Sequence, residues 1–434
     1  MHKYKKQTIY AIASKKNRRF FLMILCLLLE GCFPVSRQER EYPKKIVFTI
    51  LFGQSNSDPG IEDMLTEKIN AEFPDVTLEW ESVDWGDYFS SEIRAKIASG
   101  EVPDLIIGKA QDVATYQPSG FLAPFSREEY AKIEKNVLDS VTINGGVYGL
   151  PYNAFYQGVL YNKNIFWRYG LEVPTSPEEM EKVIQCLEEV GITPFAAHFR
   201  ENWYAGNITM QFAINQVFAK NSKWGEEFRS GLHSFVESKD YTACFCQVET
   251  IWKHTWPDAA TVNQSECAKR FANEEAAMYL TGTWAVQPIF SIRQKMTIGI
   301  FPYPNETGDA RLIFEPNLTF MKNAESPNLQ LAESVLAAIY RDTELAKTIC
   351  DFTITTSLLS GVETDSLRQV EQDINAYKEM GKVVDVTTGN RQIVWSFQAA
   401  CAVQINAWLA GKVEFKDILQ FADDNRFESG GVFR

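Results

Sequence analysis

The segment Phe271-Ala-Asn-Glu-Glu-Ala-Ala-Met-Tyr-Leu-Thr-Gly-Thr-Trp-Ala285 has the pattern of a helix end, a buried strand, a glycine turn and a new helix. Its residues Ala276–Leu280 are apolar or small, which is typical of a strand covered on both faces. Gly282 permits a tight turn, and either neighbouring threonine can cap the next helix. Such turns at the carboxyl edge of a sheet are where α/β proteins bind ligands. Trp284, which stands in this turn, is therefore either a core residue or a ligand contact.

The first part of the chain alternates between strand and helix patterns. The strand patterns are Ile46–Phe52, Val76–Trp80 and Val102–Gly108. The helix patterns between them run from Asp58 to Pro74 and from Asp84 to Gly100. This order predicts a doubly wound α/β lobe.

Polar loops follow these expected strands, at Gln54–Asp58, Glu81–Trp85 and Lys109–Asp112. Loops at the carboxyl ends of such strands are natural ligand positions. We expect ligand contacts here from Asn56, Asp58, Asp84 and Trp85. The alternative is that the polar residues among them only cap helices or face solvent.

A second strand–helix–strand pattern begins near residue 154. It contains Gly158–Gly170, a strand followed by a short helix, and Ser176-Pro-Glu-Glu179, a capping box that starts a longer helix. Thr193–His198 is the next strand pattern. Because 434 residues exceed one ordinary core, the chain is expected to form two lobes.

The N-terminus has the pattern of an export signal. A basic segment, Lys15–Arg19, precedes the apolar Phe20–Leu29, which is shorter than the roughly 20 residues of a membrane-spanning helix. We interpret residues 1–31 as a signal peptide. Leu29-Glu-Gly-Cys32 resembles a bacterial lipobox, which implies lipidation of Cys32, although Glu30 stands where a small or aliphatic residue is usual. The alternatives are an ordinary cleaved signal and an uncleaved anchor.

The charge of the remaining chain excludes some partners. Residues 1–31 carry seven Lys and Arg against one Glu, a net charge of +6. Because the whole chain has a formal charge of −13, the remaining residues have a formal charge of −19. A body this acidic argues against nucleic acid as a main partner. We expect residues 32–44, which are polar, to form a lipidated tether between membrane and fold.

Several segments, in this order, resemble one family. They are Ala98–Leu105, Gly120–Phe125, Gly146–Tyr152, Tyr161–Phe166 with Pro174-Thr175, Phe271–Ala285 and Phe301–Pro304. The family is that of the extracellular solute-binding proteins of ABC importers, in the sugar-binding, maltose-binding-protein-like group. The resemblance implies an α/β protein with a two-lobed periplasmic-binding-protein fold (type II). Each lobe is a sheet flanked by helices, and hinge strands join the lobes. We expect residues 45–153 and 300–355 in lobe 1, and 154–299 and 356–434 in lobe 2.

The resemblance also implies a sugar site between the lobes. Indole and phenol rings cover the apolar face of a pyranose, and planar polar groups bind its hydroxyl rim. Trp284 matches a stacking tryptophan of the family, and Trp395 resembles another. Further expected contacts, by position or by chemistry, are Trp85, Tyr152, Trp203, Asp84, Asp58, Asn56 and Glu315.

The expected function is to bind a mono- or oligosaccharide and to deliver it to an ABC permease by hinge closure. We expect a monomer, lipid-anchored on the extracytoplasmic face of the cell membrane, with no catalytic residue, metal or cofactor. The alternatives are a ligand-sensing subunit for a membrane receptor and an extracytoplasmic glycoside hydrolase with two facing carboxyl groups.

The cysteines leave one question open. The group Cys244, Cys246, His254 and Cys267 fits no structural zinc pattern. A disulfide joining Cys244 or Cys246 to Cys267 is favoured over a metal site, but the sequence does not choose a pairing.

Overall fold

The computed structural model describes residues 45–54, 60–84, 87–133, 135–364, 370–389, 393 and 395–426. From Val47 onward the described elements belong to one compact unit. Its main sheet has ten strands, with the order β2-β1-β3-β10-β6-β8-β7 along its main path. A separate two-stranded hairpin pairs β4 (Thr142–Ile143) with β5 (Gly146–Val147).

The first strands and helices follow the predicted α/β order. They are β1 (Ile46–Gln54), α2 (Ile61–Glu72), β2 (Val76–Asp84), α3 (Asp87–Ser99), β3 (Leu105–Gly108), α4 (Ala110–Tyr116) and α5 (Lys135–Leu138). Strands β1 and β3 are parallel, with Leu51 opposite Ile106. All four residues of β3 are buried, as the apolar sequence predicts. The predicted doubly wound pattern is confirmed for this part of the chain.

Two long strands run through the middle of the sheet. Strand β6 (Leu150–Asn162) is antiparallel to β10 (Leu312–Lys322). The last residues of β6 also pair with β8 (Ala276–Gly282) and β9 (Ile298–Phe301). The C-terminal part of β10, from Thr319 to Lys322, also pairs with β3 on its other edge. Each long strand therefore belongs to both halves of the sheet.

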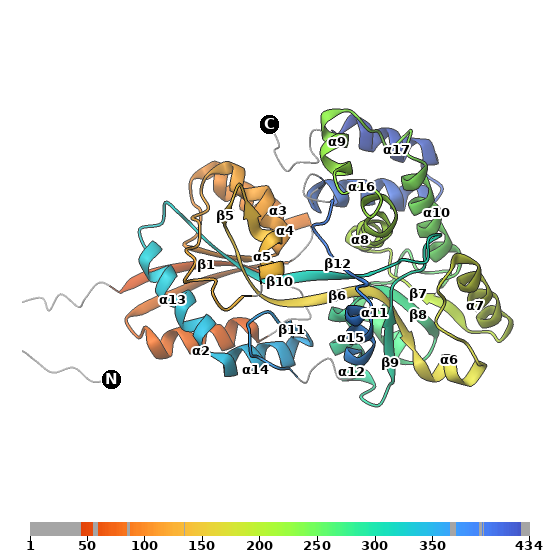
Figure 1. The fold of residues 1–434 in the computed structure, drawn as a ribbon, viewed down its shortest axis with the longest axis horizontal. Coiled ribbons are helices and arrows are strands. Elements are labelled where there is room, and N and C mark those ends of the chain that lie inside the picture. The colour runs from red at the N-terminus through yellow and green to blue at the C-terminus, as the bar shows by residue number, and fades with distance from the viewer. Residues whose placement is uncertain are drawn as a thin grey trace, which may run out of the picture. The chain divides into compact units, whose positions relative to one another are not determined.

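The remaining helices pack around this sheet, and the remaining strands belong to it. In the middle of the chain they are α6 (Lys163–Tyr169), α7 (Pro177–Glu189), β7 (Thr193–Ala196), α8 (Asn202–Ala213), a π-helix (Ile214–Phe218), α9 (Trp224–Ser230), α10 (Lys239–Lys253), α11 (Gln264–Ala272) and α12 (Val286–Ile292). Later come α13 (Leu329–Arg341), α14 (Thr343–Thr353), β11 (Thr356–Ser357), α15 (Glu371–Glu379), β12 (Val383–Asp385), α16 (Trp395–Leu409) and α17 (Phe415–Asp424). Helices α2, α13 and α14 lie on one face of the strands near β1, and α3 and α4 lie on the other (Figure 1).

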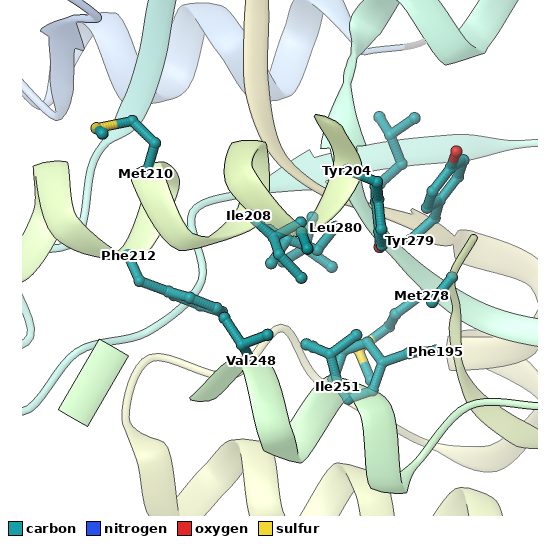
Figure 2. Packing of buried hydrophobic residues seen from close by; sticks show 14 of the residues in the cluster. Phe195, Tyr204, Ile208, Met210, Phe212, Val248, Ile251, Met278, Tyr279 and Leu280 are labelled. Atoms are coloured by element: carbon teal, nitrogen blue, oxygen red, sulfur yellow. The ribbon is translucent and has the colours of Figure 1, made fainter. Parts of the chain in front are cut away.

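Buried apolar residues form two clusters. The first takes its members from residues 48–154 and 318–359. The second takes them from residues 156–313, together with Ile354 and residues 370–422. Figure 2 shows part of the second cluster, where Phe195 of β7 and Ile251 of α10 lie near Met278 of β8. Because residues 300–313 pack in the second cluster, the chain changes cluster within β10.

Local sequence signals explain several element ends. Ser176 accepts a hydrogen bond from the backbone N–H of Glu179 at 3.2 Å, so the serine half of the predicted capping box is confirmed. The Glu179 carboxylate accepts instead from the N–H of Thr175 at 2.7 Å. Helix α2 begins at Ile61, directly after Gly60, whose φ of 106° suits a glycine. None of the helices in the described part of the chain is both long and apolar enough to span a membrane.

Candidate ligand-binding site

Trp284 lies beside the central strands. It follows β8 in a short 3-10 turn, Thr283–Ala285. Its ring meets that of Phe155 of β6 edge to face, with centroids 5.6 Å apart and planes at 87°. Phe155 is nearly fully buried, whereas Trp284 is only partly buried. The pair therefore anchors one edge of the indole and leaves part of its surface accessible.

Gly282 has a different role from the one predicted. Its φ of −134° is an extended conformation that any residue can adopt, so a tight turn does not require glycine here. A Cβ at this position would lie 2.1 Å from the Trp284 ring. The predicted threonine cap of the following turn is also wrong, because this turn has no side-chain cap. The hydroxyl oxygen of Thr283 instead accepts a hydrogen bond from the Tyr156 N–H at 3.2 Å.

A chain of polar side chains, which we call the amide relay, crosses the long strands. It consists of Lys109, Glu315, Gln157, Asn207 and Gln211. Lys109 Nζ donates to Glu315 Oε1 at 2.6 Å, and the Gln157 amide donates to Glu315 Oε2. Asn207 Nδ2 donates to Gln157 Oε1 at 3.1 Å, and Gln211 Nε2 donates to Asn207 Oδ1 at 2.9 Å. The relay connects the β3–α4 segment of the first cluster to helix α8 of the second.

The relay lies on the same sheet face as the aromatic pair. Glu315 is directly opposite Phe155 in the antiparallel register, so both side chains point to one face. Gln157 is two residues further along β6 and points the same way. The structure thus brings predicted contacts Trp284 and Glu315 together around Phe155.

Asp112 lies at the Lys109 end of the relay. Its Oδ2 accepts a hydrogen bond from the Lys109 backbone N–H at 2.8 Å. Burial raises the pKa of Asp112 to about 6, against partial opposition from the neighbouring Lys109. The charge of this carboxyl group is therefore sensitive to mildly acidic pH.

Asp84 is the last residue of strand β2, and its side chain is exposed. Partial burial raises the pKa of Asp84, and the charge of Glu201 raises it further. Glu201 precedes α8, and its Oε2 is 2.9 Å from Nδ1 of the buried His198. The same histidine ring meets the half-buried Trp203 at a centroid distance of 5.1 Å. The predicted contact Trp203 therefore shares His198 with Glu201, whereas Asp84 is related to Glu201 only through the effect of its charge.

Tyr152 lies in the first cluster. Its side chain is completely buried, and its ring meets those of Phe320 and Tyr340 at 5.9 and 5.2 Å. Burial strongly raises the pKa of its hydroxyl. These contacts give Tyr152 a packing role in this conformation and leave it no surface for a ligand.

The structure does not describe the side chains of the other predicted site residues. Trp395 is the first residue of α16, whose backbone is described but not that side chain. The expected contacts at Asn56, Asp58 and Trp85 and the expected lipidation site Cys32 lie outside the described residues.

Sequence reasoning missed Gln157, Asn207, Gln211 and Glu201. A signal existed for the amides, because Gln157 stands in a mostly apolar strand and Asn207 and Gln211 stand four apart on an apolar helix. Buried amides need partners, so such positions indicate a polar network. Glu201 had no comparable signal, since a charged residue before a helix is ordinarily a solvated cap.

The cysteines form neither a bridge nor a metal centre in the described structure. Cys244 and Cys267 are buried and free, and Cys246 is exposed and free. The expected disulfide between these positions is therefore wrong. Within the described ranges, no group of three or more His, Cys, Asp or Glu side chains is arranged to hold a metal ion.

Solved structures share this fold. The raffinose complex of the solute-binding protein RafE superimposes with a TM-score of 0.73 at 16% identity, covering 89% of this chain and 100% of that one. A sugar transporter from Bacillus licheniformis, in complex with stachyose, gives a TM-score of 0.75 at 16% identity, with 88% and 99% covered. These similarities establish the two-lobed, type II periplasmic-binding-protein fold.

The chain belongs to the bacterial extracellular solute-binding proteins, whose family model matches residues 54–344. The multiple sugar-binding protein of Streptococcus mutans is 25% identical over 56% of this chain and 59% of its own length. The melibiose/raffinose/stachyose-binding protein MelE of Bacillus subtilis is 23% identical over 80% of this chain and 81% of its own length. The match to the first of these relatives thus spans about three fifths of that protein.

Proposed function

We propose that this protein binds a mono- or oligosaccharide between its two lobes and delivers it to an ABC transporter permease by hinge closure. The observation that carries this proposal is the partly exposed Trp284, whose neighbour Phe155 lies on the same sheet face as the relay residues Glu315 and Gln157. Both relay side chains are buried and bonded to each other in this conformation, so the accessible indole is the surface offered to the ligand. An indole face and planar polar groups are the two surfaces that a pyranose requires. The names of the related proteins, which describe sugar binding, support the same ligand class.

The two lobes correspond, in this proposal, to the two apolar clusters. Lobe 1 contains residues 48–154 and 318–359, and lobe 2 contains most of the remaining core. The sequence predicted that the chain returns to lobe 1 at residue 300. In this division the chain returns to lobe 1 within strand β10. Strands β6 and β10 are then the hinge, because both run from one cluster into the other.

Export and lipid anchoring belong to the proposal as well. The leader and Cys32 support secretion and attachment to the extracytoplasmic face of the membrane. Metabolic labelling with radioactive palmitate tests the anchor, and the Cys32→Ala variant should lose the label and be released into the medium. Equal labelling of both chains would contradict it.

The proposal includes a binding role without catalysis, and one experiment tests both parts. The purified mature chain is titrated with glucose, galactose, maltose, raffinose and stachyose while tryptophan fluorescence is recorded. We expect saturable changes and a higher melting temperature with the bound sugar. Chromatography of the incubated sugar should show no hydrolysis products. Product formation would indicate a glycosidase, and no response to any sugar would contradict the proposed ligand class.

A further inference from the structure

Ile354 has a backbone conformation that its side chain disfavours. It follows helix α14 with φ 53° and ψ 55°, in the left-handed region. A β-branched residue is a clear outlier there, because its Cβ lies too close to the following carbonyl oxygen. Glycine, which has no Cβ, is the usual residue in this conformation after a helix. Such strain persists only where the surrounding structure enforces it.

The side chain of Ile354 packs with the other cluster from its neighbours in sequence. Ile349 before it, and Leu358 and Leu359 after it, belong to the first cluster. Ile354 itself is 9% exposed and belongs to the second cluster. The left-handed turn therefore directs a side chain from a lobe 1 segment into the core of lobe 2.

The segment around Ile354 is attached to the hinge strand β6. Thr355 Oγ1 accepts a hydrogen bond from Asn153 Nδ2 at 2.9 Å, and β11 pairs with β6 at Asn153 and Ala154. On β6, Ala154 belongs to the first cluster and Tyr156 to the second. Ile354 is therefore held next to the point where the chain passes from one lobe to the other.

A second strained residue lies on the other hinge strand. Leu318 of β10 has φ 37° and is buried in the first cluster, whereas Ile313 of the same strand packs in the second. Within the described ranges, the other non-glycine residues with positive φ are Asn144 and Glu274, and neither is buried. The two buried apolar residues with this strain thus both lie where the lobes join.

We propose that Ile354 is a strained latch between the lobes, which sets the sugar affinity without contacting the sugar. This inference rests on the proposed sugar-binding function. Burial of the side chain stabilises the lobe arrangement of this structure, and the strained backbone opposes it. A rotation of the lobes about β6 and β10 would withdraw the side chain from lobe 2 and let the backbone relax.

The latch acts on the arrangement that favours a bound sugar. Helix α3 of the first cluster contacts α16 of the second, so the lobes approach each other in this structure. A ligand bound between lobes favours such an arrangement, and any residue that stabilises it raises the affinity. The side chain of Ile354 therefore raises the affinity, and its backbone strain limits the increase.

The latch is tested by truncating the side chain and titrating the mature chain with its tightest sugar. Ile354→Ala should raise Kd about 10-fold. The matched control is Ile349→Ala on the same segment, because Ile349 is fully buried but packs in one cluster only. It should lower the melting temperature and leave Kd unchanged.

Two outcomes separate the latch from the proposed function. Equal Kd values for the wild type and Ile354→Ala overturn the inference but leave sugar binding intact, whereas a wild type that binds no sugar contradicts the proposed function. If Ile354→Ala does not fold, Ile354→Val and Ile349→Val make the same comparison, with an expected rise of about threefold for Ile354→Val alone.

The role of the strain is tested by comparing Ile354→Gly with Ile354→Ala. Both variants lack the buried side chain, but only alanine keeps the Cβ that disfavours the left-handed conformation. If rotation of the lobes relieves the strain, the glycine variant should have a Kd about fivefold lower than the alanine variant. Equal Kd values would show that this residue stays left-handed in every lobe arrangement, and would overturn the strained latch.

The lobe arrangement has a direct readout in pulsed electron paramagnetic resonance. Spin labels are placed at Glu67→Cys on α2 and Lys182→Cys on α7, two exposed positions on different lobes, with the accessible native cysteines replaced by serine. Without sugar, Ile354→Ala should shift the distance distribution away from that of the wild type, and Ile349→Ala should not. Identical distributions in all three proteins overturn the latch.

Discussion

Lys109 and Glu315 form an ion pair of 2.6 Å in which the glutamate side chain is only 3% exposed. The lysine follows strand β3 of the first cluster, and the glutamate lies on β10, where the chain passes between clusters. The glutamate also accepts a hydrogen bond from the Gln157 amide, so each of its two carboxylate oxygens has a hydrogen-bond donor. The charge of Glu315 is therefore compensated only while its partners stay in place.

Removal of Lys109 should destabilise the protein. Lys109→Met leaves the Glu315 carboxylate buried without its cation, which costs several kcal/mol in fully buried pairs. Because Lys109 is 23% exposed, solvent reduces this cost. We expect the free energy of unfolding to fall by about 2–3 kcal/mol in urea titrations followed by tryptophan fluorescence.

The control for this variant is Lys220→Met. Lys220 pairs with Asp240 at 2.7 Å, but the two side chains are 55% and 43% exposed. Its loss should cost less than about 1 kcal/mol. Equal effects of the two substitutions would show that the Lys109–Glu315 pair has no special importance.

Trp284 should dominate the affinity. Trp284→Ala removes a stacking surface at the centre of the proposed site, and we expect Kd to rise at least about 30-fold, or about 2 kcal/mol. Trp284→Phe should lose less because a ring remains. Trp167 on α6 is 85% exposed, so Trp167→Ala is the matched control and should leave Kd unchanged. Isothermal titration calorimetry measures all three, and equal losses in both alanine variants would argue against stacking.

Gly282→Ala should affect binding through its neighbour. The new methyl group would lie 2.1 Å from a Trp284 ring atom, so the indole must rotate away. We expect a shifted tryptophan emission maximum and a Kd raised in the same direction as in Trp284→Ala. Far-UV circular dichroism should stay unchanged, since Gly282 has an extended backbone that alanine can adopt. Wild-type affinity in this variant would mean that the position of the indole is unimportant.

Asp112 should make stability depend on pH. Burial raises its pKa from an ordinary 3.8 to about 6, so between these values the folded state binds more protons than the unfolded state. The contribution of Asp112 to the free energy of unfolding therefore grows as pH falls and is lost as pH rises. Asp112→Asn removes this dependence. We expect the stability of the variant relative to wild type to increase from about pH 4 to about pH 7, by no more than about 3 kcal/mol.

A pH-independent difference between Asp112→Asn and wild type would contradict this assignment. The comparison isolates Asp112 because all other titrating groups are shared by both proteins. Glu344 is an exposed carboxylate in the first turn of α14. The variant Glu344→Gln is therefore the control for the effect of the change in net charge.

Reducing agents should not change the melting temperature. The six cysteines in the described part of the chain are all free, and burial raises the pKa of the Cys244 and Cys267 thiols. Buried thiols of this kind are poor nucleophiles. Scanning calorimetry with and without dithiothreitol should give the same transition, and a lower one in dithiothreitol would indicate a bridge.

Local patterns predicted much of the fold. The apolar run Ile46–Phe52 and the cap residue Ser176 each specify one element through short-range chemistry, and both elements form. The change of cluster within β10 was not predictable in this way. Its sequence reads as one continuous strand, and only pairing with partners distant in sequence assigns its two ends to different cores.

The candidate site was predicted less completely than the fold. Trp284 and Glu315 come together because the register of β6 opposite β10 places Glu315 across from Phe155. That register is a long-range property, so the sequence offered the residue types but not their proximity. Tyr152 shows the reverse case, because a tyrosine beside a glycine-rich turn suggested a contact, yet strand pairing directs its ring into the core.

The chain order of the two clusters has a consequence for biogenesis. The first cluster is completed only by residues 318–359, which follow the entire 156–313 segment of the second. The chain is synthesised and exported with its N-terminus first. The apolar residues of the first cluster are therefore exposed, without their later partners, while the second cluster is still being made. Contacts so distant in sequence slow folding and leave unpaired strand edges open to aggregation. During synthesis and export, the first half of the molecule must wait for β10 before it can fold.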